Sequence, residues 1–166
     1  MNFDQWQKLI TSSDAADRIE ATDFLPDGEI TPTIVDQLLK VLADESPLAR
    51  TCAADTLGSI PSERVRAALK ARLAVEDDPL TTAFLYSSLG AMGNPEDAPI
   101  LNQALQQTSN GTSRSHAALG LLLCCTPAAM RAIIDTCNHS DYKARATAFS
   151  QLKQATDLFL ELTEAA

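Results

Sequence analysis

Basic residues are scarce in this sequence. Its 166 residues include 13 Lys and Arg against 22 Asp and Glu, which gives a formal net charge of −9. Residues 73–112 contain five acids and no base. The bases gather in one short segment, residues 61–72, as Arg64, Arg66, Lys70 and Arg72. Because a surface that neutralises phosphates needs many clustered Lys and Arg, nucleic acid is a poor general partner for this chain.

Long apolar runs and targeting signals are missing too. The longest apolar stretch, Ala117–Cys125, is interrupted by Gly120 and is far shorter than the roughly 20 residues that cross a bilayer. The N-terminal segment MNFDQWQKLI lacks the basic leader and apolar core of a signal peptide. We therefore expect a cytoplasmic protein with no membrane association. The length and the 45% hydrophobic content suit one domain with a buried core.

Signatures of catalysis, metal binding and cofactor binding are also absent from the sequence. The cysteines include no C-x-x-C pair, and the histidines are not at zinc-site spacings. The adjacent Cys124 and Cys125 could form a redox pair, but they end an apolar helical pattern, where cysteine usually acts as a small apolar residue. The triplet Glu76-Asp77-Asp78 lacks the spacing of a calcium loop and is interpreted as solvated turn acids. We expect no catalytic residue, no metal and no cofactor.

What the sequence does contain is an internal repeat. The pattern Arg-x-x-Ala-x-x-x-Leu begins at Arg18, Arg50, Arg114 and Arg145, with a degenerate copy at Thr82, so that successive steps are 32, 32, 32 and 31 residues. A second helical pattern, with apolar residues spaced by 3, 4 and 7, precedes each copy. Helix starts with proline are indicated at Thr31-Pro32, Ser46-Pro47, Ile60-Pro61, Asp78-Pro79, Asn94-Pro95 and Thr126-Pro127.

These patterns predict an all-α fold, a right-handed α-solenoid of about five helix pairs. Each pair exposes an apolar face that only its neighbours can cover, so the pairs must stack. We expect one domain over residues 1–166, closed at its C-terminal end by a capping helix. The expected repeats are 1–29, 30–60, 61–93, 94–125 and 126–153, and the expected capping helix is 154–166.

The repeats resemble a known family. The segment Ile34–Ile60 is similar to a HEAT-like repeat of the kind found in phycobilisome-lyase-type proteins, and Leu89–Leu105 is similar to the turn and first helix of the next one. In that family a loop Asp precedes Arg-x-x-Ala-Ala-x-x-Leu-Gly, which is matched here by Asp44, Arg50, Ala53, Ala54, Leu57 and Gly58. The sequence departs from the pattern at Thr82 and Tyr86, and again at Asn110-Gly111.

The resemblance implies a structural use for the repeated acids and arginines. In this family the loop Asp and the helix Arg tie adjacent repeats together through hydrogen bonds and charge pairing. We therefore interpret them as a structural ladder and not as a substrate channel. The members of this predicted ladder are Asp44, Arg18, Arg50, Arg114 and Arg145.

The second helices of the repeats carry the predicted binding surface. Second helices of stacked repeats usually line the concave side, which is the common binding face. The outward positions on them are acidic in the N-terminal half, and an aromatic residue follows in the middle. An aromatic anchor beside acids suits a partner that presents Lys or Arg. This predicted stripe consists of Glu20, Asp23, Asp55, Phe84, Ser87 and His116. Packing between repeats is an equal alternative for Phe84.

Three functional hypotheses follow. The first is a non-enzymatic module whose acidic concave face binds a basic protein or peptide, for example an immunity-type or antitoxin-type inhibitor. The second, implied by the resemblance alone, is a lyase-like subunit that attaches or removes a bilin chromophore. The third is nucleic-acid binding through residues 61–72, for which a solvated helix face is the alternative. Binding of a small-molecule ligand stays an open alternative.

Overall fold

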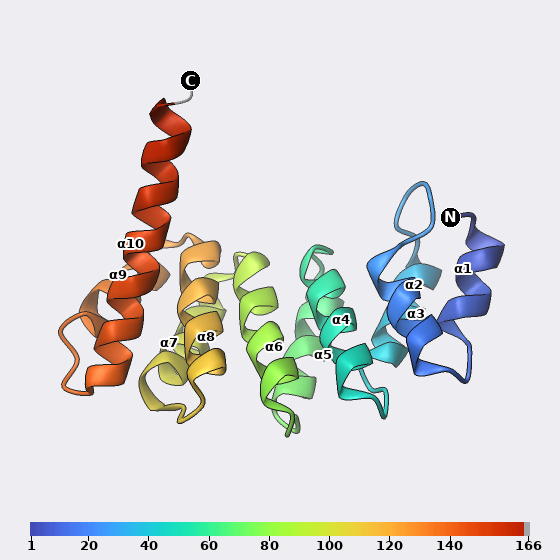
Figure 1. The fold of residues 1–166 in the computed structure, drawn as a ribbon, viewed down its shortest axis with the longest axis horizontal. Coiled ribbons are helices and arrows are strands. Elements are labelled where there is room, and N and C mark those ends of the chain that lie inside the picture. Colours follow the sequence, from blue (N-terminus) through green and yellow to red (C-terminus); the bar gives the residue numbers. More distant parts are fainter. Residues whose placement is uncertain (165–166) are drawn as a thin grey trace.

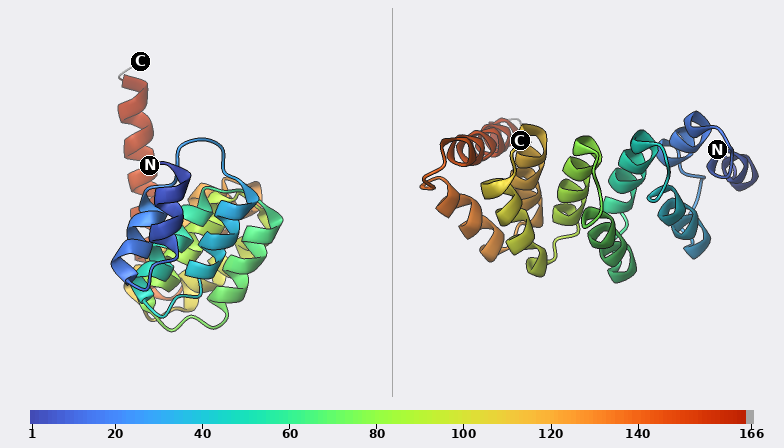
Figure 2. Two further views of the ribbon diagram at one scale, coloured as in Figure 1. Left: turned by 90° about the vertical axis from the view of Figure 1, so that its right-hand side faces the viewer. Right: turned by 90° about the horizontal axis from the view of Figure 1, so that it is seen from below.

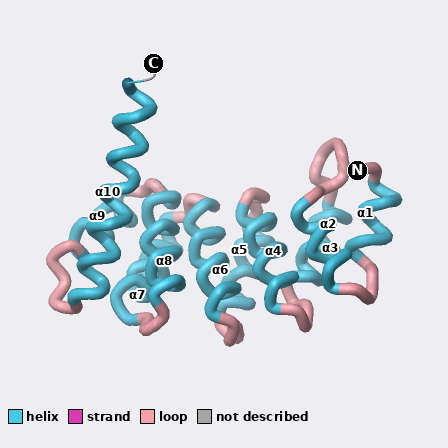
Figure 3. The backbone as a smooth tube through the Cα atoms, in the orientation of Figure 1, coloured by secondary structure: helices cyan, strands magenta, loops and turns pink. Residues whose placement is uncertain are grey.

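The computed structural model describes residues 1–164, with side chains through Asp157, as helices joined by loops (Figure 3). The helices are α1 (Phe3–Ile10), α2 (Ala15–Asp23), α3 (Pro32–Val41), α4 (Pro47–Gly58), α5 (Glu63–Leu73), α6 (Pro79–Ala91), the 3-10 helix η1 (Pro95–Asp97), α7 (Ala98–Gln107), α8 (Gly111–Cys124), α9 (Pro127–Thr136) and α10 (Tyr142–Glu164). They form five consecutive pairs, α1–α2 to α9–α10, which stack along one axis (Figure 1). The predicted all-α solenoid is confirmed.

The pairs form two layers, one of first helices and one of second helices (Figure 2). Each of the second helices α2, α4, α6, α8 and α10 packs on the next, and the most extensive contact joins α6 and α8. The first helices contact each other less, and α5 scarcely meets α7. Because the second helices approach one another more closely, their layer forms the inner side of the stack.

Side-chain caps and prolines start the helices as the sequence indicates. Ser46 and Asp78 each accept a hydrogen bond from a backbone N–H in the first turn, and a proline follows each of them. The predicted start at Ile60-Pro61 is displaced, because α5 begins after Ser62, which supplies the capping oxygen. Asn94-Pro95 begins η1, and α7 follows directly from it.

The C-terminal end of the stack differs from the prediction. The sequence predicts a helix boundary near residue 153 and a separate capping helix over 154–166, whereas α10 runs without a break from Tyr142 to Glu164. No glycine or proline interrupts the sequence of α10, so nothing ends the helix at the predicted boundary. The helix rises beyond its neighbours (Figure 1). The apolar side chains of residues 158–162, on which the capping prediction rests, lie outside the described side chains.

The buried core is divided into two clusters. The first runs from Trp6 to Leu89 and joins α1 to α6, and the second runs from Ala98 to Ala148 and joins α7 to α10. Trp6 is fully buried in the first cluster, and its Nε1–H donates to the Ala21 carbonyl at 2.8 Å. The division falls between the third and fourth helix pairs.

Glycines bring the two halves together along the second helices. A Cβ on Gly90 of α6 would collide with the backbone of Gly120 on α8, and a Cβ on Gly120 would lie 2.7 Å from the Tyr86 carbonyl oxygen. Gly58, one repeat before Gly90, likewise leaves room for Ser88. These glycines therefore allow a backbone-to-backbone approach of neighbouring helices.

Candidate functional site

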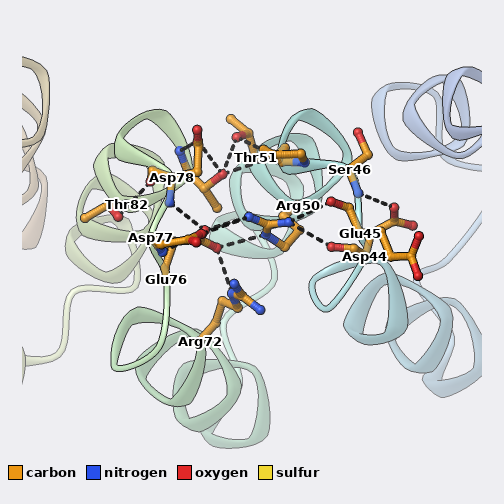
Figure 4. A network of polar contacts seen from close by, with 12 residues as sticks. Asp44, Glu45, Ser46, Arg50, Thr51, Arg72, Glu76, Asp77, Asp78 and Thr82 are labelled. Carbon is orange, nitrogen blue, oxygen red and sulfur yellow. Dashed lines mark hydrogen bonds and ion pairs between the residues drawn. The ribbon is translucent and has the colours of Figure 1, made fainter.

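A ladder of arginines joins successive turns of the second-helix layer. Arg50 of α4 donates from Nε and Nη2 to the two carboxylate oxygens of Glu76 in the next repeat, at 2.9 and 2.7 Å. Its Nη1 donates to the carbonyls of Asp44 and Glu45, in the turn before its own helix, at 2.9 and 3.2 Å. Figure 4 shows the guanidinium lying between the two turns. One side chain thus holds two repeats in register.

The other arginines of the predicted ladder make related contacts. Arg18 binds both carboxylate oxygens of Asp44 at 2.5 and 2.8 Å, and Arg114 donates to Asp141 at 3.1 Å. Each also donates to the carbonyl six residues before it, as does Arg145. The acid partner of Arg50 is Glu76, which the sequence analysis did not place in the ladder.

The ladder is interrupted at the third repeat, and another ion cluster supplies the link there. Thr82 stands at the arginine position, and its hydroxyl donates to the Asp78 carbonyl within α6. The connection to the fourth repeat comes instead from α5, where Arg66 binds both oxygens of Asp97 at 2.6 and 2.9 Å. Lys70 donates to the same carboxylate at 3.1 Å. Asp97 is fully buried, so this link lies inside the fold.

Ion pairs occupy the basic segment on which the nucleic-acid alternative rests. Arg66 and Lys70 bind Asp97, Arg64 lies 2.6 Å from an oxygen of Asp36, and Arg72 donates to Glu76 at 2.7 Å. All four bases of residues 61–72 therefore have an acidic partner. They offer no cluster of uncommitted charge for phosphates.

The three acids of the triplet Glu76-Asp77-Asp78 lie in three different environments. Glu76 is fully buried, contrary to the expectation of solvated turn acids, because Arg50 and Arg72 both bind its carboxylate. Burial alone would raise the pKa of Glu76, but the two arginines outweigh it and lower the pKa to about 2. Asp77 is almost fully exposed, and Asp78 caps α6. Among the described residues no group of three or more His, Cys, Asp and Glu side chains could hold a metal ion.

A groove on the inner layer brings together four of the six residues of the predicted stripe. It has a volume of about 330 Å³ and crosses three second helices. Asp55 of α4 lies at one wall, Phe84 and Ser87 of α6 line the middle, and His116 of α8 lies opposite. We call this the inner groove. It lies where the two halves of the core meet.

Contacts within the inner groove fix its aromatic side chains. The rings of Phe84 and His116 are tilted by 43°, with centroids 5.0 Å apart. The Ser87 hydroxyl lies 3.0 Å from the Phe84 carbonyl, to which it donates, and 3.2 Å from Nδ1 of His116. Burial lowers the pKa of His116, although the negative charge of Asp55 opposes this shift. The lowered pKa favours the neutral form of the His116 ring, whose Nδ1 is occupied by the Ser87 hydroxyl.

The two remaining residues of the stripe lie outside the groove. Asp23 is exposed at the end of α2, and it raises the pKa of Cys52 together with Asp55, although burial of the thiol is the larger cause. Glu20 lines a different pocket, of about 650 Å³, with Phe24 and residues of α1. The structure thus divides the predicted stripe into one groove and two acidic positions beside it.

Phe84 and Tyr86 occupy different surroundings. Phe84 both packs against the first core cluster and lines the inner groove, so each of its two expected roles has a structural counterpart. Tyr86 packs against the second core cluster, and burial raises its pKa.

The sequence analysis missed the apolar wall of the inner groove. Leu119 and Leu123 of α8 line it opposite Asp55, and Leu123 is 46% exposed. The small residues Ser88 and Ala91 of α6 also line the groove. The helical spacing of four between the two leucines is the signal that could have identified this wall.

The adjacent cysteines differ from each other in burial. Cys124 is buried, with its Sγ 3.5 Å from the Asn94 carbonyl oxygen, whereas Cys125 is exposed and ends α8 with a positive φ of 50°. Both are free thiols in the structure.

Within the described residues, no helix is both long enough and apolar enough to cross a membrane.

Two comparisons bear on the identity of the chain. In the first, no curated protein matches it. A family model for HEAT repeats matches residues 4–87, which is 84 of the 166 residues. The match supports HEAT repeats in general, and the finer resemblance to phycobilisome-lyase-type proteins stays a prediction. With its stacked helix pairs and this match, the chain belongs to the HEAT-repeat family.

Proposed function

We propose that this protein is a non-enzymatic protein-binding module whose acidic inner face binds a basic protein or peptide. One observation carries the proposal. Along α2, α4, α6 and α8, every exposed charged side chain without an ion pair is acidic, whereas α10 at the C-terminal end of the layer carries the exposed bases Lys143 and Lys153. The acidic side chains are Glu20, Asp23 and Asp55.

The arginines of this layer do not neutralise the acids. Arg18, Arg50 and Arg114 are bound to acids and carbonyls of the inter-repeat turns, so their charge is used within the fold. A surface with charge of one sign steers an oppositely charged partner and fixes its register. A concrete form of this function is an immunity-type or antitoxin-type inhibitor that covers a cationic protein toxin. That form rests on charge alone.

The arrangement of Ser87 and His116 supports a binding role over catalysis. A serine nucleophile must give its proton to the neighbouring base. Here the Ser87 hydroxyl lies 3.0 Å from the Phe84 carbonyl of its own helix, and this acceptor competes with His116 Nδ1, at 3.2 Å, for the single hydroxyl proton. This competition disfavours transfer of the proton to the ring and supports a role in positioning side chains.

Affinity capture with a charge-matched control tests the proposal. The tagged protein is used to recover partners from its native host at low and moderate salt, and a partner identified by mass spectrometry is then measured by calorimetry. We expect a basic protein whose affinity falls with salt. The double variant Glu20→Gln/Asp23→Asn should weaken binding about tenfold, mainly through slower association.

The control variant changes the net charge by the same amount, but on the layer of first helices. Asp4 of α1 and Asp135 of α9 are both exposed on first helices. The variant Asp4→Asn/Asp135→Asn should therefore bind as well as the unchanged protein. Equal weakening by both double variants, or recovery of no basic partner at either salt concentration, would contradict the proposal.

A further inference from the structure

The inner groove contains hydrogen-bond acceptors without matching donors. Asp55 is exposed and forms no ion pair, and its carboxylate can only accept. The hydroxyl protons of Ser87 and Ser59 are already donated to backbone carbonyls, at 3.0 and 2.7 Å. Nδ1 of His116 lies 3.2 Å from the Ser87 hydroxyl, so this ring nitrogen is occupied within the protein. A ligand that fits this groove must supply the donors.

The walls of the groove are apolar and aromatic. Phe84 and His116 present adjacent rings, and Leu119 and Leu123 continue the α8 wall beyond His116. An aliphatic stem can lie along the leucines, and a planar cation can stack on the rings. The volume of about 330 Å³ is at the small end of the range for ligand pockets, which suits one long side chain.

We propose that the inner groove is a pocket for a single arginine side chain of a protein partner, with its guanidinium bound to Asp55 and stacked on Phe84. This inference deepens the proposed function, on which it rests for the class of partner. Arginine fits better than lysine because its planar group can stack on a ring and donate two parallel hydrogen bonds to one carboxylate. The pocket that contains Glu20 is about twice as large and also includes the base Lys8, which repels a cation, and Asp23 lines neither pocket.

Chemical-shift changes in the NMR spectrum of the protein, measured while a small ligand is added, test the pocket. The probe is N-acetyl-arginine methylamide, and its neutral isostere, N-acetyl-citrulline methylamide, is the matched ligand control. We expect the arginine probe to shift the ring signals of Phe84 and His116, with binding in the millimolar range. The lysine analogue should bind more weakly and the citrulline analogue at least tenfold more weakly.

Two variants locate the contact. Asp55→Asn removes an exposed carboxylate, so the protein should fold normally and lose at least tenfold in affinity for the arginine probe. Asp135→Asn removes an exposed acid of the first-helix layer, outside the binding face, and should leave binding unchanged within twofold. Equal binding of arginine and citrulline, or unchanged arginine binding by Asp55→Asn, would overturn the pocket.

A second probe separates the pocket from the wider function. If the arginine probe leaves the groove signals unchanged while a ten-residue lysine peptide binds through Glu20 and Asp23, the pocket is wrong and the acidic face stands. If the arginine probe fills the groove while the host yields no basic partner, the pocket stands and the proposed function fails.

Discussion

Glu76 shows how one side chain can link three parts of the stack. Its carboxylate accepts from Arg50 of the preceding repeat and from Arg72 of its own first helix, and also from the backbone N–H groups that follow it. A carboxylate fully buried among two guanidinium groups is stabilised in its charged form. The same residue is therefore a source of acid sensitivity.

The stability of the fold should depend on the ionisation of Glu76. Its pKa falls from an ordinary 4.5 to about 2 in the folded protein, so its stabilisation is complete above pH 4.5 and is lost as the pH falls toward 2. The shift corresponds to roughly 3 kcal/mol. Urea unfolding measured from pH 6 to pH 2.5 should show this loss, and Glu76→Gln should reduce the slope, with the remainder coming from Asp44, Asp97 and Asp141, whose pKa values are lowered too.

The neighbouring Asp77 provides the control for that measurement. It is 94% exposed and lies 3.8 Å from Arg50, so Asp77→Asn should change the free energy of unfolding by less than about 1 kcal/mol. The explanation fails if Glu76→Gln keeps the full acid slope, or if Asp77→Asn removes it.

At the level of elements, the contact between α6 and α8 is the most extensive among the described residues. Gly90 and Gly120 place the two backbones against each other, and the inner groove lies over the same helices. Helices that approach this closely tolerate no side chain at the crossing. The glycines thus determine how α6 and α8 present Phe84 and His116 to each other.

Adding one methyl group at this crossing should destabilise the protein. Gly90→Ala introduces a Cβ that collides with the backbone of Gly120, so we expect a loss of about 1–3 kcal/mol in the free energy of unfolding. Gly111→Ala is the control, because a Cβ on Gly111 meets no atom within 4 Å. Thermal and urea unfolding should show a loss for Gly90→Ala alone, and a loss of equal size in both variants would refute the close-contact explanation.

At the scale of the whole molecule, two core clusters meet at one junction. The clusters join α1–α6 and α7–α10, and the buried Asp97 binds Arg66 and Lys70 across the boundary. Burial raises the pKa of Asp97, but the hydrogen bonds from Arg66 and Lys70 outweigh it and give a net lowering. In a solenoid each repeat is stabilised mainly by its neighbours, so a weakened junction uncouples the two sides.

Neutralising Asp97 should separate the stabilities of the two halves. Asp97→Asn removes the buried carboxylate of Arg66 and leaves it only the exposed Glu63 and Glu96, which should cost about 3 kcal/mol. Native-state hydrogen exchange should then show faster opening of α7–α9, while α1–α4 keep their protection.

The exposed neighbour of Asp97 is the control. Glu96 is 75% exposed and lies 3.1 Å from Arg66, so Glu96→Gln should leave the exchange pattern nearly unchanged. A uniform loss of protection along the whole chain in Asp97→Asn would contradict an uncoupled junction.

The repeat made much of the fold predictable. Leucines and alanines at helical spacing identify helices without tertiary information, and capping residues such as Ser46 and Asp78 mark their starts. The end of the chain was harder to predict, because the boundary near residue 153 has no stop signal in the sequence. The repeat period alone suggested a boundary there.

The candidate site was predicted only in part. The repeat alignment brought Asp55, Phe84 and His116 to one face, and the structure places all three in the inner groove. It also placed Glu20 on that face, whereas the structure puts it in a different pocket beside α1. Alignment assigns a face to each position, but distances across three helices depend on how closely those helices pack.

The sequence by itself determined the repeat, the helix pairs and the excess of acid, because each depends on residue type and local spacing. Only the tertiary structure decided which charges remain available. It buried Glu76 and Asp97 with their arginines, while it left Asp55 without a base at the edge of a groove. The physical reason is that pairing of charges across repeats depends on distances of a few ångströms between residues about 26 to 31 positions apart.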